Sequence, residues 1–289
     1  MKRLGVIAGF LCLSVQAAIA GDPPWDVSLS SSQVFQGGVV KINVSGSDIS
    51  GVKGSVSNKE LLFFLNEHGS YSALLGVDLE EKSSTIEIII SARNRAGEPS
   101  EKQVVLRVRE KAFPKEEISV PVSFDRIDEA TRKRIEREQA RLARLWTVSS
   151  SQRLWEGGFL IPVPGEVTSR FGLRRVVNGQ ARAPHSGVDF RAPLGTEIIA
   201  ANHGRVALRD DFFFSGRSIV LDHGGGLYTE YFHLSEFRVG EGQQVRKGDL
   251  IGLAGMTGRV TGPNLHWAVR LNGARVDPFQ LLETIGSRQ

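Results

Sequence analysis

Short runs of β-branched and other apolar residues, separated by small polar residues, occupy this chain on both sides of one highly charged segment. In the first block such runs lie at residues 40–44, 61–65, 85–90 and 104–108. Clusters of Gly, Ser and Asn separate them, and short strands at this spacing with turn signals between them favour a small antiparallel sandwich. We therefore expect a small N-terminal β-sandwich over residues 25–110.

One loop of this block has a familiar sequence. Ala92-Arg93-Asn94-Arg95-Ala96-Gly97-Glu98-Pro99-Ser100 resembles a loop of bacterial immunoglobulin-like modules. The resemblance implies an immunoglobulin-like sandwich that acts as a spacer or adhesive module without chemistry of its own.

The charged segment lies within residues 111–155, which we expect to be a linker. Residues 125–146 are rich in Arg and Glu, and four apolar side chains within them are spaced so that they could share one narrow helical stripe: Ile127, Ile135, Leu142 and Leu145. This pattern predicts a charged connector helix. We interpret its charge run as a solvated helical face rather than a nucleic-acid patch.

Residues 156–285 form the second block, in which glycine is frequent and short apolar runs again dominate. No long helical pattern interrupts these runs. The whole chain is therefore predicted to be all-β apart from its helical connector.

The first residues indicate export. Lys2 and Arg3 precede an apolar run over residues 4–17, and Ala18-Ile19-Ala20 has the small-x-small pattern of a cleavage site. This arrangement predicts a signal peptide over residues 1–20, with a retained N-terminal anchor as the alternative. The single cysteine, Cys12, lies inside it, so neither disulfides nor thiolate ligands are expected after cleavage. We expect an exported protein of the periplasm or cell surface.

Charge and hydropathy bear on two classes of partner, nucleic acid and the membrane. The chain of 289 residues has a formal net charge of +4. No block of Lys and Arg contains interleaved aromatic residues, so nucleic acid is not expected as a partner. After the N-terminal segment, no apolar run is long enough to predict a transmembrane span.

Two short segments contain residue types that bind metals. His185-Ser186-Gly187-Val188-Asp189 places an imidazole and a carboxylate four residues apart, in a context where glycine and flanking prolines disfavour a helix. A turn that enters a strand could bring both side chains to one point, and both suit Zn²⁺. By itself this spacing also fits a surface histidine beside a salt-bridged aspartate.

The second segment contains Asn264 and His266, which would share one face of a strand. His266 could complete a set of two histidines and one carboxylate, which leaves a fourth tetrahedral position for water. His233 lies outside this set and could act as a general base or stabilise an oxyanion. Taken singly, each histidine could equally be structural.

In combination these segments form an ordered series that resembles the lysostaphin/LytM-type zinc metallopeptidases over about residues 159–282. The series comprises Gly-Glu-Val-Thr-Ser-Arg-Phe-Gly from 165, His-Ser-Gly-Val-Asp from 185, Ala-Pro-Leu-Gly-Thr from 192, Tyr-Phe-His-Leu-Ser from 231, Val-Arg-Lys-Gly-Asp-Leu-Ile-Gly from 245 and Thr-Gly-Pro-Asn-Leu-His-Trp from 261. The resemblance implies a two-layer antiparallel β-sheet peptidase domain over residues 156–285.

The same resemblance implies a function and roles for individual residues. Members of this family are mostly peptidoglycan endopeptidases, so the expected substrate is a peptide of the cell wall. His185, Asp189 and His266 would be the Zn²⁺ ligands, and His233 would be a catalytic residue. Groove contacts and structural roles both stay open for three residues: Tyr228, Tyr231 and Arg175. Two further histidines, His203 and His223, fall outside the family's ligand positions, and we interpret them as structural.

One departure from the family pattern concerns Asn264. The family has a second catalytic histidine at this position, and an asparagine side chain can donate a hydrogen bond but cannot exchange a proton at neutral pH. The leading hypothesis is still a zinc endopeptidase with His233 and Asn264 at its catalytic positions. The alternative is a weakened relative that binds peptidoglycan or regulates another envelope hydrolase as its protein partner. A third hypothesis is a surface adhesin in which the sandwich is the functional part, and only the domain type supports it.

Overall fold

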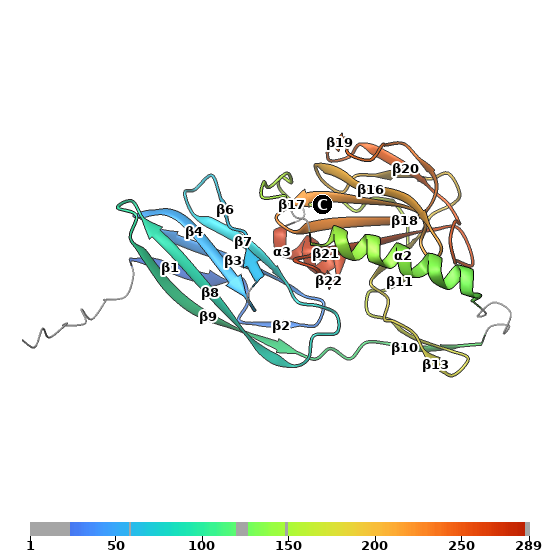
Figure 1. Ribbon diagram of the computed structural model, residues 1–289, viewed down its shortest axis with the longest axis horizontal. Coiled ribbons are helices and arrows are strands. Elements are labelled where there is room, and N and C mark those ends of the chain that lie inside the picture. The colour runs from blue at the N-terminus through green and yellow to red at the C-terminus, as the bar shows by residue number, and fades with distance from the viewer. Residues whose placement is uncertain (1–23, 58, 120–126, 148–149, 287–289) are drawn as a thin grey trace, which may run out of the picture.

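The computed structural model describes residues 24–57, 59–119, 127–147 and 150–286 of the chain. The expected signal peptide over residues 1–20, with Cys12 inside it, lies outside the described residues. Within the described part, no helix is both long and apolar enough to cross a membrane. Two β-domains are joined by a connector that includes one long helix (Figure 1).

The N-terminal domain is the predicted β-sandwich. One sheet has the order β1 (Trp25–Leu29), β3 (Val39–Gly46), β7 (Tyr71–Gly76) and β6 (Phe64–Leu65), and the other has the order β2 (Gln33–Phe35), β9 (Pro99–Arg109), β8 (Ser84–Asn94), β4 (Ile49–Val56) and β5 (Lys59–Leu61). Alternate residues of the strands point inward, which is the period expected of a half-buried strand. The core therefore consists of apolar side chains from both sheets, such as Ile42, Val44, Ile88, Ile90 and Leu106.

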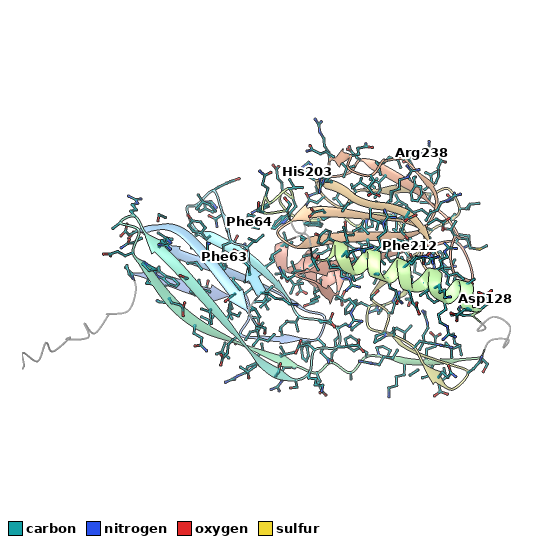
Figure 2. The ribbon with its side chains drawn as sticks, viewed as in Figure 1. Phe63, Phe64, Asp128, His203, Phe212 and Arg238 are labelled. Atoms are coloured by element: carbon teal, nitrogen blue, oxygen red, sulfur yellow. The ribbon has the colours of Figure 1, made fainter. Side chains whose placement is uncertain are left out.

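The connector is more than the linker that its sequence predicts. It contributes strand β10 (Lys115–Ile118), which pairs in parallel with β12 (Arg174–Val177) of the C-terminal domain; β12 in turn pairs with β13 (Gln180–Ala181). The predicted helix follows as α2 (Glu129–Leu145), and the side chain of Asp128 accepts a hydrogen bond from the backbone N–H of Thr131 at its N-terminus. Figure 2 shows Asp128 at this end of the helix.

A ten-stranded, mainly antiparallel sheet forms the C-terminal domain. Its main path is β11 (Val167–Ser169), β14 (Gly187–Arg191), β21 (Asn264–Leu271), β18 (Leu227–Phe237), β17 (Gly216–Gly224), β16 (Gly204–Phe212) and β19 (Gln244–Val245). Three further strands pair beside this path: β15 (Glu197–Ile199), β20 (Leu250–Ala254) and β22 (Ala274–Val276). The short helix α3 (Pro278–Ile285) follows β22.

The two faces of this sheet have different coverings. On one face, Phe190, Tyr231 and Trp267 pack in a core with Ile198 and Ile251 of the β15 and β20 layer. This packing gives the two-layer arrangement that the sequence predicts. On the other face lies helix α2, whose Leu142, Leu145 and Trp146 pack against a second cluster of four buried residues, Leu208, Phe212, Val220 and Tyr228. Figure 2 shows Phe212 beside the helix.

The sandwich contacts the C-terminal domain around β22 and α3. The guanidinium of Arg275 donates to the carboxylate of Asp78 at 2.6 Å and to that of Glu80 at 2.8 Å. The backbone N–H of Asp277 donates to the carbonyl of Gly37 at 2.7 Å. Val39 of the sandwich is buried within the core of the C-terminal domain. The interface thus joins ion pairs, backbone hydrogen bonds and apolar contacts.

Candidate metal centre

Two adjacent strands carry two of the expected ligands. Asp189 in β14 lies directly opposite His266 in β21. Their chain neighbours Val188, Phe190 and Trp267 are buried in the core beneath the sheet. Because side chains alternate along a strand, Asp189 and His266 point to the opposite face, which is the face that α2 partly covers. The sheet register therefore places a carboxylate beside an imidazole.

The third expected ligand comes from the segment that precedes β14. The backbone N–H of His185 donates to the carbonyl of Leu173 at 3.0 Å, and the carbonyl of His185 accepts from the N–H of Gly172 at 2.8 Å. These two bonds tie the segment before β14 to the segment between β11 and β12. Residues 182–186 form no helix, as the glycine and prolines led us to expect, but they are an irregular segment and not a turn.

The structure brings the three side chains to one point. His185 Nε2 lies 3.0 Å from Asp189 Oδ1 and 3.0 Å from His266 Nδ1, and His266 Nδ1 lies 2.8 Å from Asp189 Oδ1. All three side chains are largely buried, with between 9% and 14% of their surface exposed. Buried, converging nitrogen and carboxylate donors are the chemistry that Zn²⁺ selects.

Hydrogen bonding around His185 shows that these residues fit a cation. His185 Nδ1 lies 3.0 Å from the carbonyl oxygen of Arg170, which can only accept, so Nδ1 of the neutral ring carries the proton. Nε2 then presents a lone pair toward Asp189 Oδ1, a second acceptor. His266 Nδ1 contacts both His185 Nε2 and Asp189 Oδ1, and the one proton that a neutral His266 could carry there cannot satisfy both. A metal ion among the three atoms would satisfy all of them.

The carboxylate of Asp189 is held in its charged form. Burial raises the pKa of this carboxyl, but the close contacts with the rings of His185 and His266 outweigh burial and hold the pKa well below its usual range. The site therefore places a negative charge beside two histidine rings.

His233 lies beside this set on β18. Its ring centroid is 6.2 Å from that of His266. Its backbone has a φ of 65°, a left-handed conformation that is uncommon for residues other than glycine. The pairing of β17 with β18 shifts register at this point, between Arg217 and Ile219. Irregularities of this kind re-aim side chains near active sites, at some cost in backbone strain.

Two carbonyl groups fix His233. Its backbone N–H donates to the carbonyl of Ser215 at 2.9 Å, and its Nδ1 lies 2.9 Å from the carbonyl oxygen of Thr257. Because a carbonyl cannot donate, Nδ1 carries the proton and the lone pair is on Nε2. Burial is the main cause that lowers the pKa of His233 to about 4. The ring is therefore neutral at pH 7 and can accept a proton.

Asn264 begins β21 and, by strand alternation, shares the face of His266. Its side-chain oxygen Oδ1 is buried and has no hydrogen-bond partner among the described residues. Buried acceptors are usually paired. The oxygen is thus available to a ligand or to water.

The remaining sequence candidates have structural contacts. The fully buried ring of His223 lies between the carbonyl of His203 and Thr229 Oγ1, at 2.7 Å from each. His203 Nδ1 accepts from the N–H of Lys247 at 3.1 Å. Tyr231 is buried and bonded to the N–H of Ala201 at 2.9 Å, while the ring of Tyr228 packs under α2. The sequence left a groove contact and a structural role open for the two tyrosines, and these contacts support the structural role.

Residues that the sequence analysis did not single out also shape the site. The ring of Phe232 stacks on that of His266, with centroids 5.2 Å apart and planes 6° apart. The hydroxyl oxygen of Ser169 lies 3.3 Å from His185 Nδ1. Alternation along β18, with Tyr231 inward, could have placed Phe232 on the site face. No sequence pattern marks the contact of Ser169.

Arg175, the third open candidate, connects Ser169 to the connector. Its guanidinium donates to Ser169 Oγ at 3.2 Å and to Glu116 Oε2 of β10 at 3.0 Å. A chain of polar contacts therefore runs from the connector strand to the ring of His185. Side chains behind a ligand fix its orientation and basicity.

The geometry agrees with what comparison to known proteins finds. Residues 183–278 match the model of peptidase family M23. A crystal structure from Pseudomonas aeruginosa, provisionally described as an M23 peptidase, is 31% identical, with a TM-score of 0.66 over 86% of this chain and 95% of that one. The chain belongs to peptidase family M23.

Curated relatives match over less than half of the chain. Peptidoglycan DD-endopeptidase ShyA of Vibrio cholerae is 40% identical over 115 residues, which are 39% of this chain and 27% of that protein. DD-carboxypeptidase/endopeptidase Mpg of Neisseria meningitidis is 38% identical over 128 residues, 44% of this chain and 30% of that protein. The matched segments thus span less than a third of either relative.

Proposed function

We propose that this protein is a zinc-dependent endopeptidase that hydrolyses peptide cross-links or stem peptides of bacterial cell-wall peptidoglycan. The observation that carries the proposal is the convergence of His185 Nε2, Asp189 Oδ1 and His266 Nδ1 at 2.8–3.0 Å from one another. The substrate class is supported by the relatives named as peptidoglycan endopeptidases. Export to the periplasm or cell surface, where that substrate lies, forms part of the proposal.

The three ligands would hold Zn²⁺, which supplies Lewis acidity toward a scissile carbonyl and lowers the pKa of water. His233 Nε2 carries the lone pair and accepts the proton of the attacking water, because Nδ1 is occupied by the bond to Thr257. The low pKa of His233 keeps it unprotonated before the reaction. Asn264 Oδ1 accepts a hydrogen bond and orients water or substrate, but takes no proton.

The test is digestion of purified, cross-linked peptidoglycan by the zinc-loaded protein, with the released fragments identified by mass spectrometry. We expect cleaved cross-links or stem peptides from the wild type and none from His185→Ala. Equal release by both proteins would contradict the proposed site. The masses of the fragments identify the bond that is cut.

The second candidate function is a binding or regulatory protein that retains the metal without efficient hydrolysis. One observation favours it: Asn264 replaces a group that normally exchanges a proton. Asn264→His separates the two functions. If the wild type binds zinc but releases no fragments while Asn264→His does, the regulatory function is correct. If the wild type cuts and Asn264→His raises its rate, the protein is an enzyme limited at this position.

A further inference from the structure

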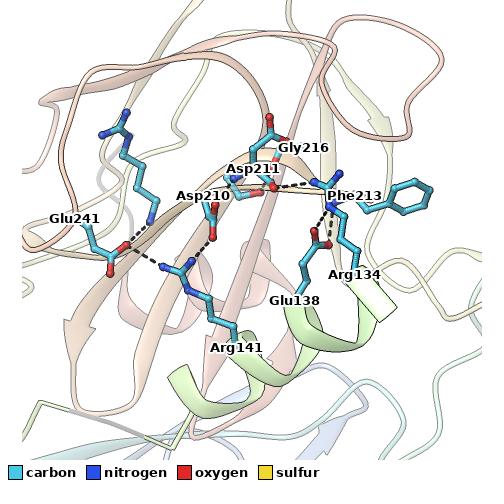
Figure 3. Close-up of polar contacts among 10 residues, drawn as sticks. Arg134, Glu138, Arg141, Asp210, Asp211, Phe213, Gly216 and Glu241 are labelled. Atoms are coloured by element: carbon cyan, nitrogen blue, oxygen red, sulfur yellow. Dashed lines mark hydrogen bonds and ion pairs between the residues drawn. The ribbon is translucent and has the colours of Figure 1, made fainter. Parts of the chain in front are cut away.

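The charged helix α2 is not wholly solvated, contrary to the interpretation of its sequence. Three of its charged side chains contact the hairpin of β16 and β17 (Figure 3). Arg134 donates to the carbonyl of Asp211 at 3.0 Å, Arg141 pairs with the carboxylate of Asp210, and Glu138 accepts from the backbone N–H of Phe213 at 2.9 Å. The helix therefore binds the hairpin next to its turn.

Glu138 differs from the other two because it accepts from the backbone of the turn itself. Only 14% of its side chain is exposed, whereas the side chains of Arg134 and Arg141 are 46% and 42% exposed. Its Oε1 accepts from Arg134 Nε at 2.6 Å, and its Oε2 accepts from Phe213. Hydrogen bonds to an ionised acceptor are stronger than neutral ones, and Arg134 orients this carboxylate. Glu138 thus fixes the first residue of the turn that spans residues 213–215.

The same turn holds His233. The carbonyl of Ser215 accepts the N–H of His233 at 2.9 Å, and the carbonyl of Phe214 accepts the N–H of Arg259 at 2.9 Å. Thr257 Oγ1 accepts the N–H of Arg217 just after the turn at 2.9 Å. The turn and the 257–259 segment are therefore bound to each other, and both carbonyl partners of His233 belong to this pair.

Close packing makes this pair sensitive to displacement. Gly216 has a φ of 59°, and a Cβ at this position would lie 2.3 Å from the backbone of Thr257. Since Gly216 packs directly against the backbone and the hydroxyl of Thr257, a shift of the turn displaces Thr257 as well. The carbonyl of Ser215 holds the backbone of His233, whose φ of 65° is otherwise unfavourable, and the carbonyl of Thr257 holds its ring.

We propose that Glu138 of the connector helix is a positioning residue for His233. It acts through the N–H of Phe213 and the carbonyls of Ser215 and Thr257, and it holds the ring of His233 in the orientation and tautomer that proton transfer needs. Its effect on the reaction rests on the proposed peptidase function of the site. Its effect on the conformation of His233 does not.

The experiment compares Glu138→Ala and Glu138→Gln with Glu136→Gln in the full-length, zinc-loaded protein. Glu136 lies on the same helix and is exposed, so Glu136→Gln is matched in residue type and charge change. With a soluble peptidoglycan fragment as substrate, we expect kcat of Glu138→Ala to fall at least about tenfold with KM changed less than about twofold. Glu138→Gln retains one acceptor and should lose less, and Glu136→Gln should match the wild type.

A second readout is independent of hydrolysis. Glu138→Ala should accelerate amide hydrogen exchange at Phe213 and His233 by at least about tenfold and alter the ring ¹⁵N shifts of His233, with zinc affinity unchanged. Unchanged exchange and shifts would overturn the proposal, whatever the activity. If Glu138→Ala alters exchange and shifts while the wild type cuts nothing, the positioning role is retained and the peptidase function is rejected. If Glu136→Gln lost as much activity as Glu138→Gln, the loss would follow from the charge of the helix and the positioning role of Glu138 would be wrong.

Discussion

The two β-domains differ in what they bury. In the described part of the chain, every buried polar or charged side chain lies in the C-terminal domain: Ser169, Asn202, Ser218, Asp222, His223, Thr229, Glu230, His233 and His266. The core of the sandwich is apolar throughout. Burial of a polar group costs free energy unless hydrogen bonds compensate it. The sandwich therefore has a core suited to stability alone. The C-terminal sheet buries polar groups both at the candidate site, as with His233 and His266, and away from it, as with His223, which is bonded to His203 and Thr229.

The largest expected effect compares one histidine from each domain. His266→Ala removes a proposed ligand, and structural zinc sites bind with about 10–16 kcal/mol, so we expect zinc affinity to fall on the order of 10³-fold. His68→Ala changes an exposed ring of the sandwich and should leave the affinity unchanged. Competition with a chromophoric chelator measures both. A wild-type affinity in His266→Ala would mean that this histidine is no ligand.

A cavity in the sandwich tests whether the domains are separable. Ile90 is fully buried there, and Ile90→Ala should lower the free energy of unfolding by about 3 kcal/mol because it leaves a cavity. Urea unfolding measures this loss. Zinc affinity at low temperature, where the variant is folded, should stay within about twofold of the wild type. A large loss of affinity would show that the sandwich core also supports the site.

Acid should weaken the C-terminal domain through His223. Burial lowers the pKa of this ring to about 4 from 6.5. Between these values the unfolded chain binds more protons than the folded one, so this histidine makes the free energy of unfolding fall as the pH is lowered through this window. Its contribution between pH 7.5 and pH 5 is about 2 kcal/mol. Urea unfolding at both pH values should show a smaller pH dependence in His223→Gln, while His68→Gln behaves like the wild type. An unchanged dependence in His223→Gln would assign the effect to other groups.

The smallest effect concerns two hydrogen-bonded serines. Ser169→Ala removes the contacts with His185 and Arg175, and we expect zinc affinity about tenfold lower. Ser100 of the sandwich is also bonded, to Trp25 Nε1 at 2.7 Å. Ser100→Ala should leave zinc affinity unchanged. Equal affinities in both variants would mean that Ser169 does not support the ligand.

The sequence was informative where local pattern decides structure. Short apolar runs separated by turn residues predicted the sandwich and the all-β C-terminal domain. The resemblance of an ordered series of motifs to a known family indicated His185, Asp189 and His266, which the sheet register and the segment before β14 bring together. The spacing of Leu142 and Leu145 predicted α2 and its apolar stripe. Each of these features is encoded by residues close together in the sequence or by the order of short motifs along the chain.

Tertiary contacts of the connector could not be predicted. The strand β10 has the charged sequence Lys-Glu-Glu-Ile, without alternation, and its partner β12 lies about sixty residues later. The carboxylate of Glu138 looks like any other acidic group on a charged helix until the turn at Phe213 lies against it. Likewise, no pattern distinguishes a buried Tyr231 from one that lines a groove. Each of these depends on which surfaces meet after the chain has folded.

Two residues that contact the surroundings of the candidate site lie outside the segment that matches the family model. The matched segment, residues 183–278, contains the three proposed ligands but neither Ser169 nor Glu138. A transfer of only this segment into another protein would carry the proposed ligands without the contact of Ser169 with His185 and without the proposed positioning residue of His233. On these proposed roles, a transferable unit that keeps the site intact starts at or before β10 rather than at residue 183.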